Sequence, residues 1–359
     1  MSLELYIFMA VIGYLAALHE IMFRRTNWWL LGMTIIVFVM TVCSRLGYEY
    51  DYSDLSDYLH YFMEENDSYF EPGYVFVTDI IRFLFGDYPV LLITFVAIWV
   101  VSFVLLSAKL TTKRLEENSF REILFFPSCL IFVFILYWGC SFACEILRNG
   151  MAISLLFCSA VLAINNKYLW AFLICLSALL FHYTAVIFLL GLLFLVIVDK
   201  LEKQTYYCWY AILVIMDLFI GFFISFEIPV VNDLFNMIDE LEMLSHYESY
   251  AGEDIDGSYF STQYITYHLL GLLMLEGDLK DKSYNRAVLL FYVGLSLGTM
   301  FQTTRFVTRI QFPYLAMVVL VLYYFLVNHG RSFWEKQVVL CSYALIQSVM
   351  VLRYLGWHL

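Results

Sequence analysis

Residues 28–74 read WWLLGMTIIVFVMTVCSRLGYEYDYSDLSDYLHYFMEENDSYFEPGY, an apolar run that passes directly into an acidic stretch. From Arg45 to Tyr74 there are eight carboxylates and seven tyrosines, and no Lys or Arg follows Arg45. A block this charged has to lie in water, whereas the run before it is suited to a bilayer. Carboxylates accept hydrogen bonds from hydroxyl groups and aromatic rings cover sugar faces, so the acidic stretch suits a carbohydrate ligand. A solvated loop that takes no part in chemistry is the alternative.

The rest of the chain repeats this alternation. Of its 359 residues, 62% are hydrophobic and only 14% are charged. This composition predicts an all-α polytopic membrane protein, a single integral membrane domain over residues 1–359 with about 11–12 helical segments. The eight cysteines lie mostly in apolar runs without the spacing of metal ligands, and no Gly-rich phosphate loop occurs. We therefore expect no metal and no cofactor, and the basic residues form no stripe that would suit nucleic acid.

The positions of Lys and Arg predict the topology, because these residues favour the cytoplasmic side. Arg24 and Arg25 place the first loop inside, so residues 3–22 form a retained first span and residues 28–44 cross outward. All eight lysines then fall on the cytoplasmic side, and two acidic loops, about 45–72 and 226–262, fall outside. Further spans are expected at 88–107, 123–143, 150–164, 206–225, 263–275, 287–304, 310–327 and 337–354.

Two segments are predicted to enter the membrane without an ordinary crossing. Gly73–Phe85 is too short to span and should form an amphipathic helix at the outer interface, with Pro72 in its first turn. Residues 168–198 have cytoplasmic signals at both ends and the sequence FHYTA in the middle. We expect a helical hairpin whose tip lies at His182.

Six cations fall on the outer side, and every one is an arginine: Arg45, Arg82, Arg148, Arg305, Arg309 and Arg353. The orientation of the chain in the membrane does not require arginine instead of lysine on the outer side. Recognition of phosphate does favour arginine, because a guanidinium presents a planar fork to two oxygens. The alternative is snorkelling at helix ends or pairing with an acidic neighbour. We take that alternative for Arg353, leave it open for Arg82, and expect a functional role for the other four.

His182 is the candidate general base. A lone histidine in an apolar run is more often a hydrogen-bonded structural residue. At the break of a hairpin, however, a neutral imidazole could remove a proton from a sugar hydroxyl.

Six short motifs give the chain a family resemblance. They are Arg45 with Gly47, Asp54-x-x-x-Tyr58, Glu71-Pro72-Gly73-Tyr74, Arg148-Asn-Gly-Met-Ala152, Phe181-His182-Tyr183-Thr184-Ala185, and Arg309 five residues before Tyr314. In this order they resemble the EpsG family, the Wzy-like polymerases of bacterial exopolysaccharide and capsule. The chain departs from the family pattern at two points. The spacing after Arg45 leaves open whether Asp51 or Asp54 fills the acidic position, and the resemblance gives no role to the acidic segment 226–262.

The resemblance implies a metal-independent glycosyltransferase of the bacterial cytoplasmic membrane, with its active site facing outside. It would join undecaprenyl-diphosphate-linked oligosaccharide repeat units, with a chain-length regulator and a flippase as partners beside the lipid bilayer. The resemblance and the residue types together suggest three groups of site residues. Arg45, Arg148, Arg305 and Arg309 would bind the diphosphate; His182, Asp54 or Glu71 would act as the base; and Tyr58 and Tyr74 would hold sugar.

Other functions fit parts of the pattern. A flippase for lipid-linked oligosaccharide would use the same arginines, although it would place them on both faces of the membrane. An O-antigen ligase-like enzyme would share the chemistry and use another acceptor. A membrane protease or acyltransferase is disfavoured, because the chain has neither a GxSG nor an HExxH motif.

Overall fold

The computed structural model describes residues 2–44, 54–64, 70–117, 126–144, 146–225, 262–301, 307–327 and 331–354. These residues form helices and no strand, which confirms the predicted all-α class. Their contacts divide the chain into two compact units. Unit 1 comprises residues 1–192 and 319–359, unit 2 comprises residues 193–318, and each is described by itself.

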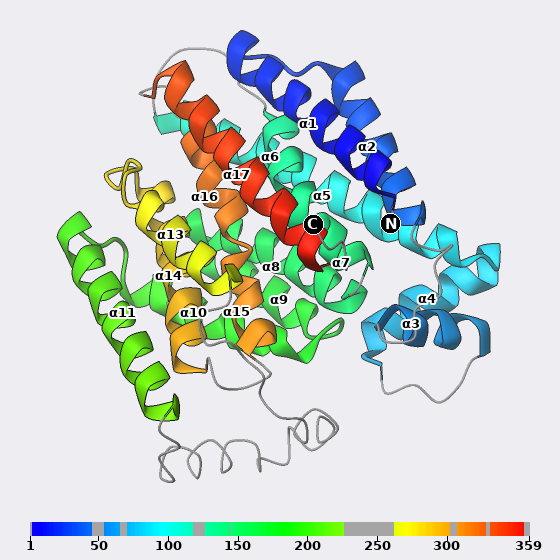
Figure 1. The fold of residues 1–359 in the computed structure, drawn as a ribbon. Coiled ribbons are helices and arrows are strands. Elements are labelled where there is room, and N and C mark those ends of the chain that lie inside the picture. The colour runs from blue at the N-terminus through cyan, green and yellow to red at the C-terminus, as the bar shows by residue number, and fades with distance from the viewer. Residues whose placement is uncertain are drawn as a thin grey trace. The chain divides into compact units, whose positions relative to one another are not determined.

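The helices follow the predicted apolar runs closely (Figure 1). Unit 1 contains α1 Leu3–Phe23, α2 Trp28–Cys43, α3 Asp54–Glu64, α4 Pro72–Phe85, α5 Tyr88–Glu117, α6 Pro127–Phe134, η2 Ile135–Gly139, α7 Cys140–Cys144, α8 Leu147–Ile164, α9 Tyr168–Ala178, η3 Tyr183–Ile187 and α17 Phe333–Tyr354. Unit 2 contains α11 Lys203–Ser225, α13 Thr262–Met274, α14 Lys282–Met300 and α15 Val307–Leu315. The unit boundaries fall within α10 Phe188–Ile197 and at the start of α16 Val318–Val327.

Five helical stretches in the described residues are long and apolar enough to cross a membrane, which fits a multi-pass membrane protein. They are Leu3–Phe23, Tyr88–Leu110, Leu147–Ile164, Ile310–Val327 and Phe333–Leu352, and five shorter apolar helices accompany them. α1 exposes Ile7, Phe8, Val11 and Leu15, as a lipid-facing helix would. By contrast, every residue of α6 is buried. α6 therefore belongs to the core of unit 1.

Several boundaries differ from the predicted ones for identifiable reasons. α5 continues to Glu117, ten residues past the predicted end of the span 88–107, because Lys, Arg, Leu and Glu are good helix formers outside the bilayer as well. α8 begins at Leu147, three residues before the predicted span 150–164, so Arg148 lies in its first turn. The predicted span 310–327 is present as Ile310–Val327, with a two-residue turn between α15 and α16.

The predicted span 123–143 contains a π-helical turn, which is wider than an α-helical turn. Its middle, η2, is a π-helix, in which the i→i−4 bonding pattern changes and backbone carbonyls become available. Two tyrosines from distant helices donate to carbonyls there: Tyr343 to Val133 O at 3.0 Å and Tyr6 to Leu136 O at 2.9 Å. These bonds tie α17 and α1 to the buried core helix.

A buried carboxylate caps α6. Glu20, in the last turn of α1, is fully buried and accepts from the Ser128 N–H at 3.0 Å and the Cys129 N–H at 2.8 Å. These N–H groups are in the first turn of α6, where no helical carbonyl can reach them. A carboxylate at a helix N-terminus also interacts favourably with the helix dipole. Glu20 is therefore a structural residue that fixes α6 to α1.

We expect Glu20→Ala to destabilise unit 1 by about 2 kcal/mol, because two buried N–H groups lose their acceptor. Glu20→Gln keeps one acceptor oxygen and should lose less. Thermal unfolding of the purified protein in nanodiscs measures both, and Glu4→Ala on the exposed start of α1 is the control. An unfolding temperature for Glu20→Ala equal to that of the control would contradict the capping role.

In unit 2, Asn285 is a hub of hydrogen bonds. It is completely buried, donates to Leu201 O at 2.7 Å and Leu279 O at 2.9 Å, and accepts from the Leu201 N–H at 3.1 Å and the Tyr206 hydroxyl at 2.9 Å. Every polar atom of the amide is thus engaged. This holds the segment before α11 against the start of α14.

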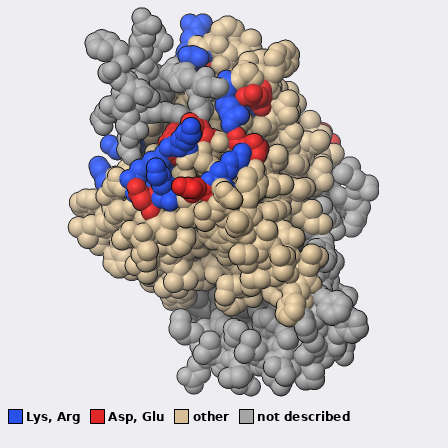
Figure 2. Space-filling view, turned by 90° about the vertical axis from the view of Figure 1, so that its left-hand side faces the viewer, with Lys and Arg blue, Asp and Glu red and all other residues tan. Residues whose placement is uncertain are grey.

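Charged side chains of unit 2 lie around this hub. Asp199 forms ion pairs with Arg286 and with Lys282, the latter at 2.7 Å, and Lys203 pairs with Glu276 at 3.2 Å. The hydrogen bond from Lys282 and the neighbouring Arg286 hold the pKa of the Asp199 carboxyl below its usual value. Figure 2 shows Lys and Arg side chains intermixed with Asp and Glu in one area of the surface.

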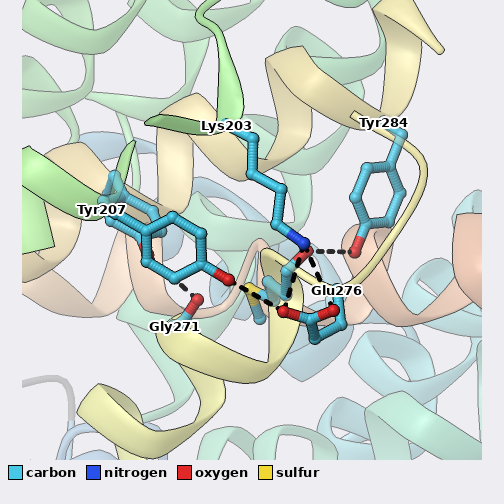
Figure 3. A network of polar contacts seen from close by, with 7 residues as sticks. Lys203, Tyr207, Gly271, Glu276 and Tyr284 are labelled. Carbon is cyan, nitrogen blue, oxygen red and sulfur yellow. Dashed lines mark hydrogen bonds and ion pairs between the residues drawn. The ribbon is translucent and has the colours of Figure 1, made fainter. Parts of the chain in front are cut away.

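Figure 3 shows two tyrosines, Tyr207 and Tyr284, that form hydrogen bonds near the end of α13. The Tyr207 hydroxyl donates to Glu276 at 2.8 Å, beside the Lys203 ammonium. The Tyr284 hydroxyl donates to Met274 O at 2.8 Å. Since these bonds engage the end of α13, they fix the turn between α13 and α14.

Candidate functional site

The candidate site begins with the contact between α3 and α4. Arg82 of α4 donates to Tyr61 O and Phe62 O in the last turn of α3, and it pairs with Asp79 at 3.3 Å. The last carbonyls of a helix have no partner within the helix and favour a cation. Arg82 therefore anchors α3 to α4, and the structure supports the structural alternative for this arginine.

Arg148 and Glu71 form an ion pair within the site. The Arg148 side chain, in the first turn of α8, donates to Glu71 Oε2 at 2.5 Å and to the Tyr58 hydroxyl at 3.3 Å. Glu71 immediately precedes α4 and its side chain is 2% exposed, whereas that of Arg148 is 17% exposed. Breaking a buried ion pair leaves an uncompensated charge and is costly. Glu71 thus fixes the guanidinium while part of it stays accessible.

Aromatic rings surround the ion pair. The Arg148 guanidinium carbon lies 4.6 Å from the ring centre of Phe70 and 5.6 Å from that of Tyr58. Tyr58 in turn packs against Tyr74, with ring centres 5.3 Å apart. Burial raises the pKa of Tyr74, so its phenol stays protonated. The rings exclude water from the guanidinium and strengthen its interaction with an anion.

The start of α8 itself favours an anion. Its N-cap residue, Ile146, provides no side-chain hydrogen bond to the first turn. The N-terminus of a helix carries a partial positive charge and N–H groups that point outward. Arg148 adds a full positive charge in the same turn.

The tip of the predicted hairpin touches this cluster. α9 ends at Ala178, the chain turns, and η3 begins after His182, so the predicted break at His182 is confirmed. The Cys175 thiol bonds to Ala185 O across the turn at 3.6 Å, as expected where the chain reverses. The Gly73 N–H then donates to Leu180 O at 2.7 Å. This bond joins the Glu71–Tyr74 motif to the tip next to His182.

His182 has a local structural partner. Its Nδ1 accepts from the Thr184 N–H at 3.3 Å and lies 2.7 Å from the Thr184 hydroxyl, and it is the N-cap of η3. An Nδ1 that accepts from a backbone N–H is unprotonated, so in the neutral ring the proton is on Nε2. In this tautomer Nε2 is a donor. As placed, the imidazole has no nitrogen ready to remove a proton.

Other predicted site residues are only partly described. Asp54 begins α3 and Arg309 lies in the first turn of α15, but their side chains are not among those that the structure describes. Arg45 and Arg305 lie outside the described residues, as do most of the two acidic loops. The site as described therefore consists of Arg148, Glu71, Tyr58 and Tyr74, with Phe70 added.

Phe70 was missed because an aromatic residue at the end of an acidic stretch is unremarkable in sequence. Its position directly before the Glu71–Tyr74 motif is the feature that could have identified it as a site residue. Among the side chains that the structure describes, no group of three or more His, Cys, Asp or Glu could hold a metal ion.

A family comparison covers the whole of this site. The model of the EpsG family matches residues 30–358, which include α3, α4, α8 and the hairpin tip. No match was found among curated proteins or among solved structures. With nearly its full length matched and the predicted motifs gathered around Arg148, this chain belongs to the EpsG family.

Proposed function

We propose that the protein is a polysaccharide polymerase that joins undecaprenyl-diphosphate-linked oligosaccharide repeat units at the outer face of the bacterial cytoplasmic membrane. The observation that carries this is Arg148, held by Glu71 among aromatic rings at the N-terminus of α8. Family membership supports the same activity.

In the proposed reaction, a hydroxyl of the acceptor unit attacks the anomeric carbon of the growing chain. The bond from this carbon to the diphosphate breaks, its electron pair stays on the phosphate oxygen, and the hydroxyl proton passes to a base. Arg148 binds the diphosphate and stabilises the charge that develops on the leaving oxygen. Arg45, Arg305 and Arg309 are proposed to assist it.

The remaining groups have narrower roles in this proposal. Glu71 positions Arg148, since its carboxylate is already engaged by the guanidinium. Tyr58 and Tyr74 are 1% and 0% exposed and pack on each other, so they support the ring cluster around Arg148 and are not open to a sugar in this structure. The base is Asp54 or His182, and for His182 to act, the bond between Nδ1 and Thr184 has to be exchanged.

The test uses purified protein in nanodiscs, incubated with the host's own lipid-linked repeat unit without nucleotide sugar, with products separated by size. A ladder of products is expected. Asp54→Asn and His182→Gln are compared with the wild type, and the base is the residue whose replacement abolishes the ladder. If the wild type forms no ladder but moves the lipid-linked unit across proteoliposomes, the protein is a transporter and the polymerase proposal fails.

A further inference from the structure

Asn149 is a buried amide in the first turn of α8. The residue is 3% exposed, and its Oδ1 accepts no hydrogen bond from the part of the chain that the structure describes. A carbonyl oxygen that leaves water without gaining a donor costs free energy, so native proteins keep few such groups. A group that a ligand completes is one reason for keeping one.

The helical turn places Asn149 between two groups of side chains. The residue before it, Arg148, donates to Glu71 at the start of α4. At the residue after it, a Cβ atom on Gly150 would lie 3.1 Å from the Trp99 ring of α5. Successive residues of a helix are turned by about 100°. The Asn149 side chain therefore leaves α8 between the side that faces Glu71 and the side that faces Trp99.

A row of aromatic rings joins these two sides. Tyr74 of α4 stacks on Phe95 of α5 with ring centres 6.2 Å apart, and Phe95 stacks on Trp99 at 6.5 Å. Tyr74 also packs on Tyr58, whose hydroxyl accepts from Arg148. The amide thus lies beside the proposed diphosphate site.

The buried atom determines the chemical class of the ligand. Oδ1 can only accept a hydrogen bond. An ionised diphosphate has acceptor oxygens and no hydroxyl to donate, so it suits Arg148 but does not satisfy Asn149. A sugar carries hydroxyl groups that donate, and in a lipid-linked repeat unit a sugar is bonded directly to the diphosphate. The two residues are consecutive, with Cα atoms about 3.8 Å apart, so they reach neighbouring groups of one ligand.

The amide can turn toward such a ligand at little cost. In the structure the Arg148 side chain is 17% exposed, whereas Asn149 is nearly closed to solvent. Because Oδ1 accepts no hydrogen bond from the described residues, rotation of the side chain breaks none at this atom. Binding would then give the carbonyl the donor that it lacks, which is favourable.

We propose that Asn149 recognises the sugar attached to the diphosphate, with Oδ1 accepting from one of its hydroxyl groups. The proposal rests on the polymerase function proposed above and adds to it a sugar-binding residue beside Arg148. One rival partner lies within the protein. The Trp99 indole N–H is also buried and unpaired among the described residues, and a small shift would let it donate to Asn149. In that case the amide is structural.

Binding of two probes to the protein in nanodiscs, measured by native mass spectrometry, tests the proposal. The probes are undecaprenyl diphosphate, which has no sugar, and the host's own lipid-linked repeat unit. Asn149→Ala should lower the affinity for the repeat unit by about 10-fold, the effect of one hydrogen bond. It should leave the affinity for undecaprenyl diphosphate unchanged, whereas Arg148→Lys should weaken the binding of both.

Two results would overturn the proposal. An equal loss of affinity for the two probes in Asn149→Ala would mean that the amide binds phosphate, and no loss for either would mean that it binds neither group. The ladder assay is read separately. If the wild type forms a ladder and Asn149→Ala binds both probes normally, only the sugar recognition fails. If Asn149→Ala weakens binding of the repeat unit alone but the wild type forms no ladder, only the polymerase activity fails.

Thermal unfolding separates ligand binding from a structural role. Asn149→Ala should keep the unfolding temperature of the wild type, because Oδ1 loses no hydrogen bond. Asn285→Ala is the matched control, since that buried amide is fully hydrogen-bonded and its loss should lower the unfolding temperature. A fall for Asn149→Ala as large as for Asn285→Ala, or a failure to fold, would assign the amide to Trp99 and overturn the proposal.

Discussion

Replacing Arg148 with lysine is expected to lower the rate of polymer formation by about 100-fold or more. Lysine keeps the positive charge but presents it as a point, whereas the guanidinium binds Glu71 and Tyr58 and still offers a planar edge to a phosphate. The initial rate of ladder formation with purified protein measures the effect. Glu71→Gln keeps a hydrogen-bond acceptor for Arg148 and should lose less activity than Arg148→Lys.

Arg331→Lys is the matched control for this substitution. Arg331 also pairs with a glutamate, Glu335, but at 3.9 Å and on the surface before α17. Its replacement should leave the rate unchanged. A rate for Arg148→Lys within a few-fold of wild type would mean that the guanidinium does not bind the diphosphate, and Arg305 and Arg309 would be tested next.

Gly73→Ala is expected to abolish polymer formation and to destabilise the protein by about 1–3 kcal/mol. A Cβ atom at position 73 would lie 2.7 Å from Leu180 O and 3.0 Å from Leu180 C, both backbone atoms. Because a backbone cannot turn aside as a side chain can, α4 and the hairpin tip would have to separate. The hydrogen bond from the Gly73 N–H to Leu180 O would be lost with them. Thermal unfolding and ladder formation measure the two effects.

Gly32→Ala on α2 is the matched control for Gly73→Ala. A Cβ atom there would meet nothing within 4 Å, and alanine favours a helix more than glycine does. Its stability should equal or slightly exceed that of the wild type. Equal behaviour of the two alanine variants would show that the close approach of Gly73 to Leu180 has no functional importance.

The sequence predicted most of the helices and the break at His182, because both follow from local properties. Apolar runs between charged segments determine where α1, α2 and α17 lie, and His182 interrupts a run too short for two crossings. Pro72 likewise predicted the start of α4. Each of these signals lies within a few residues of the feature that it predicts.

The pairings between distant residues could not be predicted in this way. Arg148 and Glu71 are 77 residues apart, and nothing in either segment indicates that the other completes it. Asp217 and His268 are a similar case. The π-helix η2 was missed because its partners, Tyr6 and Tyr343, come from opposite ends of the chain.

The cap that Glu20 provides for α6 constrains how the protein is made. Its partners Ser128 and Cys129 leave the ribosome more than 100 residues after Glu20 does. Until then the carboxylate lacks the two backbone donors of α6, and its position one turn from the end of α1 lets it stay near water. We therefore expect the first helix to reach its final depth after its own insertion. On this expectation, assembly of the amino-terminal helices is completed when α6 is inserted and its first turn binds Glu20.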